Sequence, residues 1–147
     1  MKKTFPSRGR KMQSGVMLLE ALIGILIFSL GILAMVGLQA LAVRLSTDAR
    51  DRAEASNLAS QIIGEMWLNR ANLGTYAYAG GTVPAPLASW MTKVQAQLPD
   101  STANPPTITM APSTLNPAAG TATTVTLQWR NPTDTTVHQF VMTAYIN

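Results

Sequence analysis

The sequence contains no cysteine, one histidine and only 12% charged residues. Without cysteine the chain has no disulfide, no thiolate metal ligand and no thiol nucleophile. It also shows no paired acids, metal-ligand cluster or Ser/His/Asp pattern that would define a catalytic centre. The one histidine, His138, lies at the start of an expected strand and is interpreted as a surface or edge residue. We therefore predict that the protein is not an enzyme and uses no metal and no cofactor.

Acidic residues are absent from the N-terminal leader, which carries five cations: Lys2, Lys3, Arg8, Arg10 and Lys11. After Gly15, six basic side chains face seven acidic ones, which leaves a net charge of −1 although the whole chain carries +4. The basic character thus belongs to the leader. Nucleic-acid binding needs a basic stripe on the folded domain, so no nucleic acid partner is expected.

Charged residues are also missing from Ala21 to Val43, a run of 23 residues. As an α-helix this run would be about 35 Å long, enough to cross the hydrocarbon core of a bilayer. By the positive-inside rule, the leader cations place the N-terminus in the cytoplasm and the residues after Arg44 on the other side. The sequence predicts one membrane span.

From Arg44 to Arg70 apolar residues recur only at helical spacing, which predicts an amphipathic helix. The members of its apolar stripe are Ala55, Leu58, Ala59, Ile62, Ile63 and Met66. Joined to the apolar run, this segment gives a helix of about 55 residues that ends near Asn72 to Gly74. A second, short amphipathic helix is predicted from Leu87 to Leu98, where Pro99 stops it.

The C-terminal third predicts strands. Residues 100–120 are rich in Pro, Thr, Asn and Ala and are expected to form a loop, apart from a short strand at Thr107 to Met110. Apolar residues then alternate before and after a turn at Asn131 to Asp134, which predicts a β-hairpin. They are Val125, Leu127 and Trp129, then Phe140, Met142, Ala144 and Ile146. The expected fold class is α+β: a long N-terminal helix, with a membrane half and an amphipathic half, packed on a small C-terminal antiparallel sheet.

The most informative residues are Gly15, Val16 and Glu20, between the basic leader and the apolar run. A carboxylate in a membrane helix costs about 2.5 to 3.5 kcal/mol at the centre and less near an end, so it usually has a functional partner. If the chain is cut after Gly15, the new α-amine of Val16 lies four residues from Glu20. In a bundle of such chains, the Glu20 carboxylate of one subunit could pair with the α-amine of a neighbouring subunit, and the reverse.

Lys11, Gly15 and Glu20, followed by the apolar run, resemble the class III signal of type IV prepilins and pseudopilins. The resemblance implies that prepilin peptidase cleaves after Gly15 and methylates the new N-terminus at Val16, and that Glu20 is the carboxylate used in assembly. It divides the chain into a leader peptide, residues 1–15, a transmembrane and assembly helix, residues 16–43, and a periplasmic pilin-like domain, residues 44–147. Val16 departs from the Phe or Met that is more usual at that position.

Four further segments are similar to PilV-type minor pilins: Ser29 to Gln39, Glu65 to Asn72, the short tryptophan-bearing helix that ends at Leu98 and Pro99, and Val125 to Arg130. This similarity implies an inner-membrane precursor that contacts other minor pilins and the major pilin through its N-terminal helix. Such a subunit primes pilus assembly and lies at or near the pilus tip. The chain departs from many major pilins at Gly37, where they have a proline, and in lacking a C-terminal disulfide loop.

Other interpretations remain open. A minor pseudopilin of type II secretion shares the cleavage site, the glutamate and the helix, and neighbouring genes would distinguish it. A DNA-uptake pilin is disfavoured by the charge of the mature chain, and an ordinary signal anchor would carry Glu20 only as a residue near its end. Gly24, Gly31 and Gly37 either permit close helix packing or let the helix loosen in a filament.

Two groups in the expected domain also have alternative interpretations. The three tryptophans, Trp67, Trp90 and Trp129, are most simply core or helix-packing residues, with adhesion as the alternative. The charged residues from Asp48 to Glu54 form either a solvated face or a surface that sets the register against neighbouring subunits.

The cleavage site yields the first prediction. Replacing Gly15 by leucine should leave the full-length precursor in the membrane, because a bulky side chain would stand where the resemblance implies that the peptidase needs glycine. Immunoblotting of membranes would separate precursor from mature chain. A mature chain of normal size from this variant would contradict the assignment.

Overall fold

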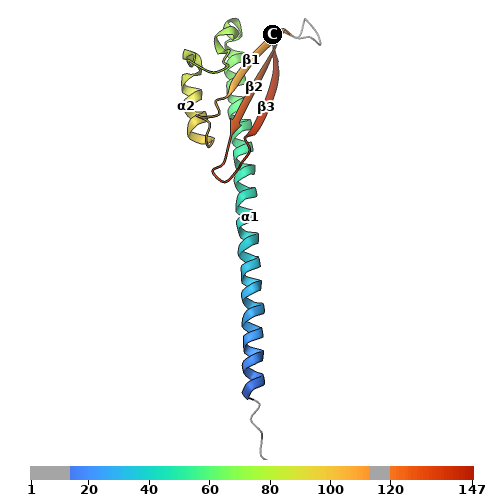
Figure 1. The fold of residues 1–147 in the computed structure, drawn as a ribbon. Helices are drawn as coiled ribbons and strands as arrows, with labels where there is room; N and C mark the ends of the chain where they lie inside the picture. The colour runs from blue at the N-terminus through green and yellow to red at the C-terminus, as the bar shows by residue number, and fades with distance from the viewer. Residues whose placement is uncertain (1–13, 113–119) are drawn as a thin grey trace, which may run out of the picture. The chain divides into compact units, whose positions relative to one another are not determined.

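The computed structural model describes residues 14–112 and 120–147. The chain divides into two compact units, Met1–Leu45 and Ser46–Asn147, and each is described by itself. Helix α1, Ser14–Leu68, contributes residues to both units (Figure 1). Most of the predicted leader, residues 1–13, and part of the predicted loop, residues 113–119, lie outside the described residues.

In the first unit α1 is apolar around its whole circumference. From Val16 to Leu45 its large apolar side chains are between 48% and 73% exposed, and none is buried by another described element. A helix that is hydrophobic on every side suits an apolar solvent rather than water. This helix is long and apolar enough to cross a membrane.

In the second unit the same helix has one buried stripe. Ala55, Ala59, Ile62 and Met66 are fully buried, and Leu58 and Ile63 are nearly so. These residues are three or four positions apart and therefore share one face of the helix. The stripe predicted from their spacing is confirmed.

The end of α1 differs from the prediction. The helix ends at Leu68, and a 3₁₀ segment, η1 (Arg70–Tyr76), follows with a non-helical residue at Asn72. The amide of Asn69 is shared between the carbonyls of Glu65 and Met66, at 3.1 and 3.2 Å, as is common at helix ends. Its side-chain amide donates to the buried Tyr76 hydroxyl at 3.2 Å. The hydrogen bond between Asn69 and Tyr76 spans the 3₁₀ segment that follows the α-helix.

The second predicted helix is present as α2, Ala88–Gln97, preceded by the short 3₁₀ helix η2, Ala85–Leu87. Trp90, Met91 and Val94 are buried on one face. The indole N–H of Trp90 donates to the carbonyl of Leu58 at 2.9 Å, so α2 is joined to α1 by a buried hydrogen bond as well as by apolar contact. Pro99 follows the helix end, as expected.

The sheet consists of β1 (Thr107–Pro112), β2 (Thr121–Trp129) and β3 (His138–Ile146), in the order β1-β2-β3, with both pairs antiparallel. Val125, Leu127 and Trp129 of β2 are fully buried, and Ile146 of β3 is nearly so. In the turn between β2 and β3 the amide of Asp134 donates to the carbonyl of Asn131 at 2.9 Å. The predicted hairpin and its buried face are confirmed.

Gly120 is required where the chain enters β2. Its φ is +82°, and a Cβ there would collide with the carbonyl oxygen of Ile146 on the neighbouring strand. Only glycine accepts that conformation with so close a backbone. The fold as a whole is α+β, a long N-terminal helix packed against a small antiparallel sheet, and the core joins α1, α2 and the sheet.

The buried stripe of α1 yields the second prediction. In a fragment that begins at Arg44, Ile62→Ala should lower the free energy of unfolding by about 2 to 5 kcal/mol, because it leaves a cavity at a fully buried position. Thermal unfolding followed by circular dichroism measures the loss. Leu68→Ala is the matched control, since that side chain lies on the same helix but is 91% exposed. Equal melting of the two variants would contradict this packing.

Candidate functional site

The predicted cleavage site lies in the first turn of α1. Ser14 is the first described residue of α1, and both residues of the Gly15–Val16 bond are helical. Val16 is 64% exposed, and no described atom lies within 4 Å of a Cβ built on Gly15. Among the described residues nothing shields this bond from an enzyme.

Glu20 lies one turn further along the same helix and is exposed. Its side chain makes no hydrogen bond or ion pair with any other residue in 14–112 or 120–147. The next basic residue along the helix is Arg44, 24 positions on, or about 36 Å at 1.5 Å per residue. Within the described part of the chain Glu20 is therefore a carboxylate without a cation, on an otherwise apolar helix surface.

An α-amine at Val16 would change this situation. Four residues correspond to about 6 Å along the axis and to the same face of the helix, so a charged amine on Val16 and the Glu20 carboxylate would be neighbours. In an apolar environment such opposite charges attract far more strongly than in water. The geometry can hold a positive charge next to Glu20, supplied by the chain's own new N-terminus or by another molecule.

Gly24, Gly31 and Gly37 lie on the exposed apolar surface of the same helix. A Cβ at any of them would have no described atom within 4 Å. They are therefore not required by contacts within the chain. Two interpretations of these glycines stay open: close packing against another helix, and local loosening of the helix. The first needs a neighbouring helix and the second a filament, and the single chain contains neither.

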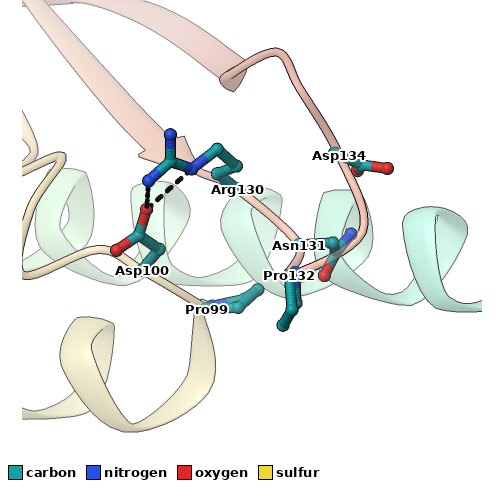
Figure 2. Close-up of a pocket in the computed structure, with 6 residues that line it drawn as sticks. All are labelled: Pro99, Asp100, Arg130, Asn131, Pro132 and Asp134. Atoms are coloured by element: carbon teal, nitrogen blue, oxygen red, sulfur yellow. Dashed lines mark hydrogen bonds and ion pairs between the residues drawn. The ribbon is translucent and has the colours of Figure 1, made fainter.

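In the second unit a groove lies where the end of α2 meets the end of β2 (Figure 2). Its walls are Pro99 and Pro132, and an ion pair holds Arg130 to Asp100 with Nη2 2.7 Å from Oδ2. The Arg130 amide donates to the carbonyl of Pro99 at 3.1 Å, and Asp100 adopts a left-handed φ of 56°. These polar groups satisfy one another. They hold the loop after α2 to the end of β2. Because Asp134 is paired with His138, none of the described residues that line the groove offers a free charged group to a ligand.

His138 joins a second polar cluster, which sequence reasoning missed. Its Nε2 lies 2.8 Å from Asp134 Oδ2, its Nδ1 lies 3.7 Å from Asp48 Oδ1, and its ring stacks on Trp129 with centroids 5.8 Å apart. Arg52 contacts the other oxygen of Asp48 at 3.0 Å. The histidine begins β3, an edge strand of the sheet, as expected, but its side chain is partly buried and makes polar contacts that were not predicted. Its hydrogen bond to Asp134 and its stack on Trp129 lie within the hairpin, whereas its approach to Asp48 of α1 is not a hydrogen bond.

Part of this cluster had a sequence signal. The hairpin register places His138 opposite Trp129, and Asp134 precedes it by four residues, so both contacts follow from the predicted turn. The contact with Asp48 depends on how the helix crosses the sheet, and no sequence spacing encodes it.

Two other expectations need correction. Trp90 and Trp129 are fully buried, but Trp67 is 42% exposed and does not belong to the core. In the charged segment Arg50 and Arg52 are exposed, whereas Asp51 is only 6% exposed and its Oδ2 has no hydrogen-bond partner. The segment is therefore not uniformly a solvated face, because the helix turns Asp51 inward.

No protein-family model, no curated protein and no solved structure matches this chain. Within the described residues no group of three or more His, Asp and Glu side chains is placed to hold a metal ion.

The His138 cluster yields the third prediction. His138→Ala removes the stack on Trp129 and leaves Asp134 without its partner, so it should lower the free energy of unfolding by roughly 1 to 2 kcal/mol. Val137→Ala, at the adjacent exposed position, should have little effect. Thermal melts of both variants test this. If they melt together with the parent, the cluster does not stabilise the hairpin.

Proposed function

We propose that the chain is the precursor of a minor type IV pilus subunit of the PilV type. Prepilin peptidase cleaves it between Gly15 and Val16 and methylates Val16. The mature subunit is assembled through the helix that begins at Val16, primes pilus assembly with other minor pilins and the major pilin, and lies at or near the pilus tip.

The observation that carries this proposal is Glu20, a single carboxylate on an apolar helix with no cation among the described residues to pair with it. An ionisable side chain in a membrane helix is costly and rare, and it marks a functional site. Cleavage after Gly15 creates the α-amine that it lacks. In a bundle of subunits, the carboxylate of an entering chain would pair with the amine of a neighbour and so set the depth at which the entering chain docks.

The apolar helix supports a membrane-held intermediate. Its exposed apolar circumference suits lipid before assembly and the apolar interior of a filament afterwards. The leader cations favour a cytoplasmic N-terminus, which places Ser46–Asn147 in the periplasm before assembly. The partners are then prepilin peptidase, the inner membrane and other pilins, with no nucleic acid.

A minor pseudopilin of type II secretion is the alternative, because it would use Gly15, Val16 and Glu20 in the same way. The similarity of Ser29 to Gln39 and of Val125 to Arg130 to PilV-type minor pilins favours the pilus. Co-purification with pilus minor subunits, rather than with secretion pseudopilins, would distinguish the two.

The experiment that tests the class is mass spectrometry of the chain purified from its source. The expected mature protein begins with N-methylated Val16. An unprocessed N-terminus, or cleavage at another bond, would overturn the proposal.

Glu20 yields the fourth prediction. Glu20→Ala should still be inserted and cleaved, because the peptidase reads the leader and Gly15, but it should enter pili or complexes with other minor pilins far less. Loss of one buried charge pairing costs roughly 2 kcal/mol or more, which corresponds to about a thirtyfold loss of incorporation or more. Glu65→Ala, which removes an acid from the Ser46–Asn147 unit, is the control. Normal incorporation of Glu20→Ala would refute the pairing role.

A further inference from the structure

Two polar side chains interrupt the uncharged run from Ala21 to Val43, and they differ in how they are satisfied. The hydroxyl of Ser29 donates to the carbonyl of Ile25 in the same helix at 2.7 Å. The side-chain amide of Gln39 makes no hydrogen bond with any other described residue. Within this run, Gln39 therefore carries a polar side chain that the single chain leaves unsatisfied.

The position of Gln39 keeps its amide away from water when α1 crosses a membrane. Gln39 lies five residues before Arg44, about 7.5 Å along the helix axis, which places it inside the apolar run. The Cα–Cβ bonds of an α-helix are tilted toward its N-terminus, so the side chain leans back into the run rather than out toward Arg44. An amide in hydrocarbon is costly unless it is hydrogen-bonded. A polar group on another helix at the same depth would remove that cost.

The helix face around Gln39 is otherwise apolar and uncovered. Phe28, Ile32 and Met35 are exposed and lie within about 40° of Gln39 around the helix. From Phe28 to Gln39 the steps are four, three and four residues, the alternation by which one helix packs along a parallel partner. We call these four residues the Gln39 seam.

Glu20 lies on a different side of the helix. It precedes Gln39 by 19 residues, which places it about 100° away around the helix. Two copies that meet along the Gln39 seam therefore keep their Glu20 carboxylates apart. Gly24 and Gly31 lie within about 40° of Glu20, so the face that carries Glu20 stays open for the contact proposed above.

We propose that the Gln39 seam is the contact face for a second copy of this chain in the membrane. The two helices run parallel, as two chains with the same membrane orientation must, and pack about a two-fold axis along the membrane normal. This axis brings the two Gln39 side chains together at one depth. A primary amide both donates and accepts, so two of them can hydrogen-bond to each other between helices, whereas two like charges would repel.

Cysteine cross-linking tests the contact in the full chain, which has no cysteine of its own. In membranes of cells that express two differently tagged copies, Ile32→Cys should give a disulfide-linked dimer that carries both tags after treatment with a membrane-permeant oxidant. Leu30→Cys is the matched control and should cross-link far less. Leu30 is also exposed and apolar and lies two positions away, but it is about 180° from Gln39 around the helix.

The role of the amide is tested in the Ile32→Cys background. Gln39→Leu should reduce the cross-linked dimer about fivefold, because it removes the interhelical hydrogen bond and keeps an apolar side chain on the seam. Gln39→Asn keeps the amide and should retain more dimer than Gln39→Leu. Ser29→Ala is the control and should leave the dimer unchanged, because the Ser29 hydroxyl is already satisfied within its own helix. Immunoblots of the membranes normalise the dimer to the amount of each variant.

Three results with the cysteine variants would overturn the proposal: equal cross-linking of Ile32→Cys and Leu30→Cys, no dimer with both tags, or a cross-link only to a different protein. Two results with the polar variants would also overturn it. The first is a Gln39→Leu chain that cross-links like its parent, and the second is a Ser29→Ala chain that loses as much dimer as Gln39→Leu.

The contact does not depend on the proposed cleavage or on the Glu20 pairing. The same cross-link is expected in the uncleaved Gly15→Leu precursor and in the Glu20→Ala variant, because neither residue lies on the Gln39 seam. Failure of the contact is therefore distinguishable from failure of the proposed function, which is read from the N-terminus of the mature chain.

Discussion

The folded domain depends on one contact surface, the apolar stripe of α1 between Ala55 and Met66. The sheet and α2 both pack against it, and a strand pair or a ten-residue helix of this size has little stability alone. Trp90 shows how closely the surfaces fit, since its indole reaches the carbonyl of Leu58 inside the core. With no disulfide, this burial is the main source of stability.

The earlier part of the same helix has a different surface, one that is long and apolar enough to cross a membrane. Before Leu45 its apolar side chains point in all directions, and after Ser46 they keep to one face. Glu20 interrupts the apolar part with a carboxylate. No cation among the described residues pairs with it, and an apolar solvent would offer none. Under the proposed function, this lack of a partner is useful, because a subunit whose charge is satisfied only by a neighbour is stable in a bundle and less so alone.

Most elements of the fold could be predicted from spacing alone. The stripe of α1, the buried face of α2 and the alternation of β2 and β3 each follow from one local period. The end of α1 could not, since no spacing in the sequence marks Leu68, and the contact of Asn69 with the buried Tyr76 that accompanies it joins the residue after α1 to the last residue of η1. The exposure of Trp67 and the burial of Asp51 were missed for a related reason. A periodic pattern predicts which residues share one face of a helix, but it does not predict how far along the helix other elements cover that face.

The residue pattern alone predicts the apolar helix, the position of Gly15, Val16 and Glu20 at its start, and the strand pattern of the C-terminal hairpin. These features depend on residues close together in the chain, where helix and strand periods apply directly. By contrast, the sequence pattern does not predict that His138 approaches Asp48, that Arg130 pairs with Asp100, or that Tyr78 bridges Ile108 at the edge of the sheet. Each of these contacts joins residues at least 30 positions apart. Their meeting is set by how whole elements pack, which no local period encodes.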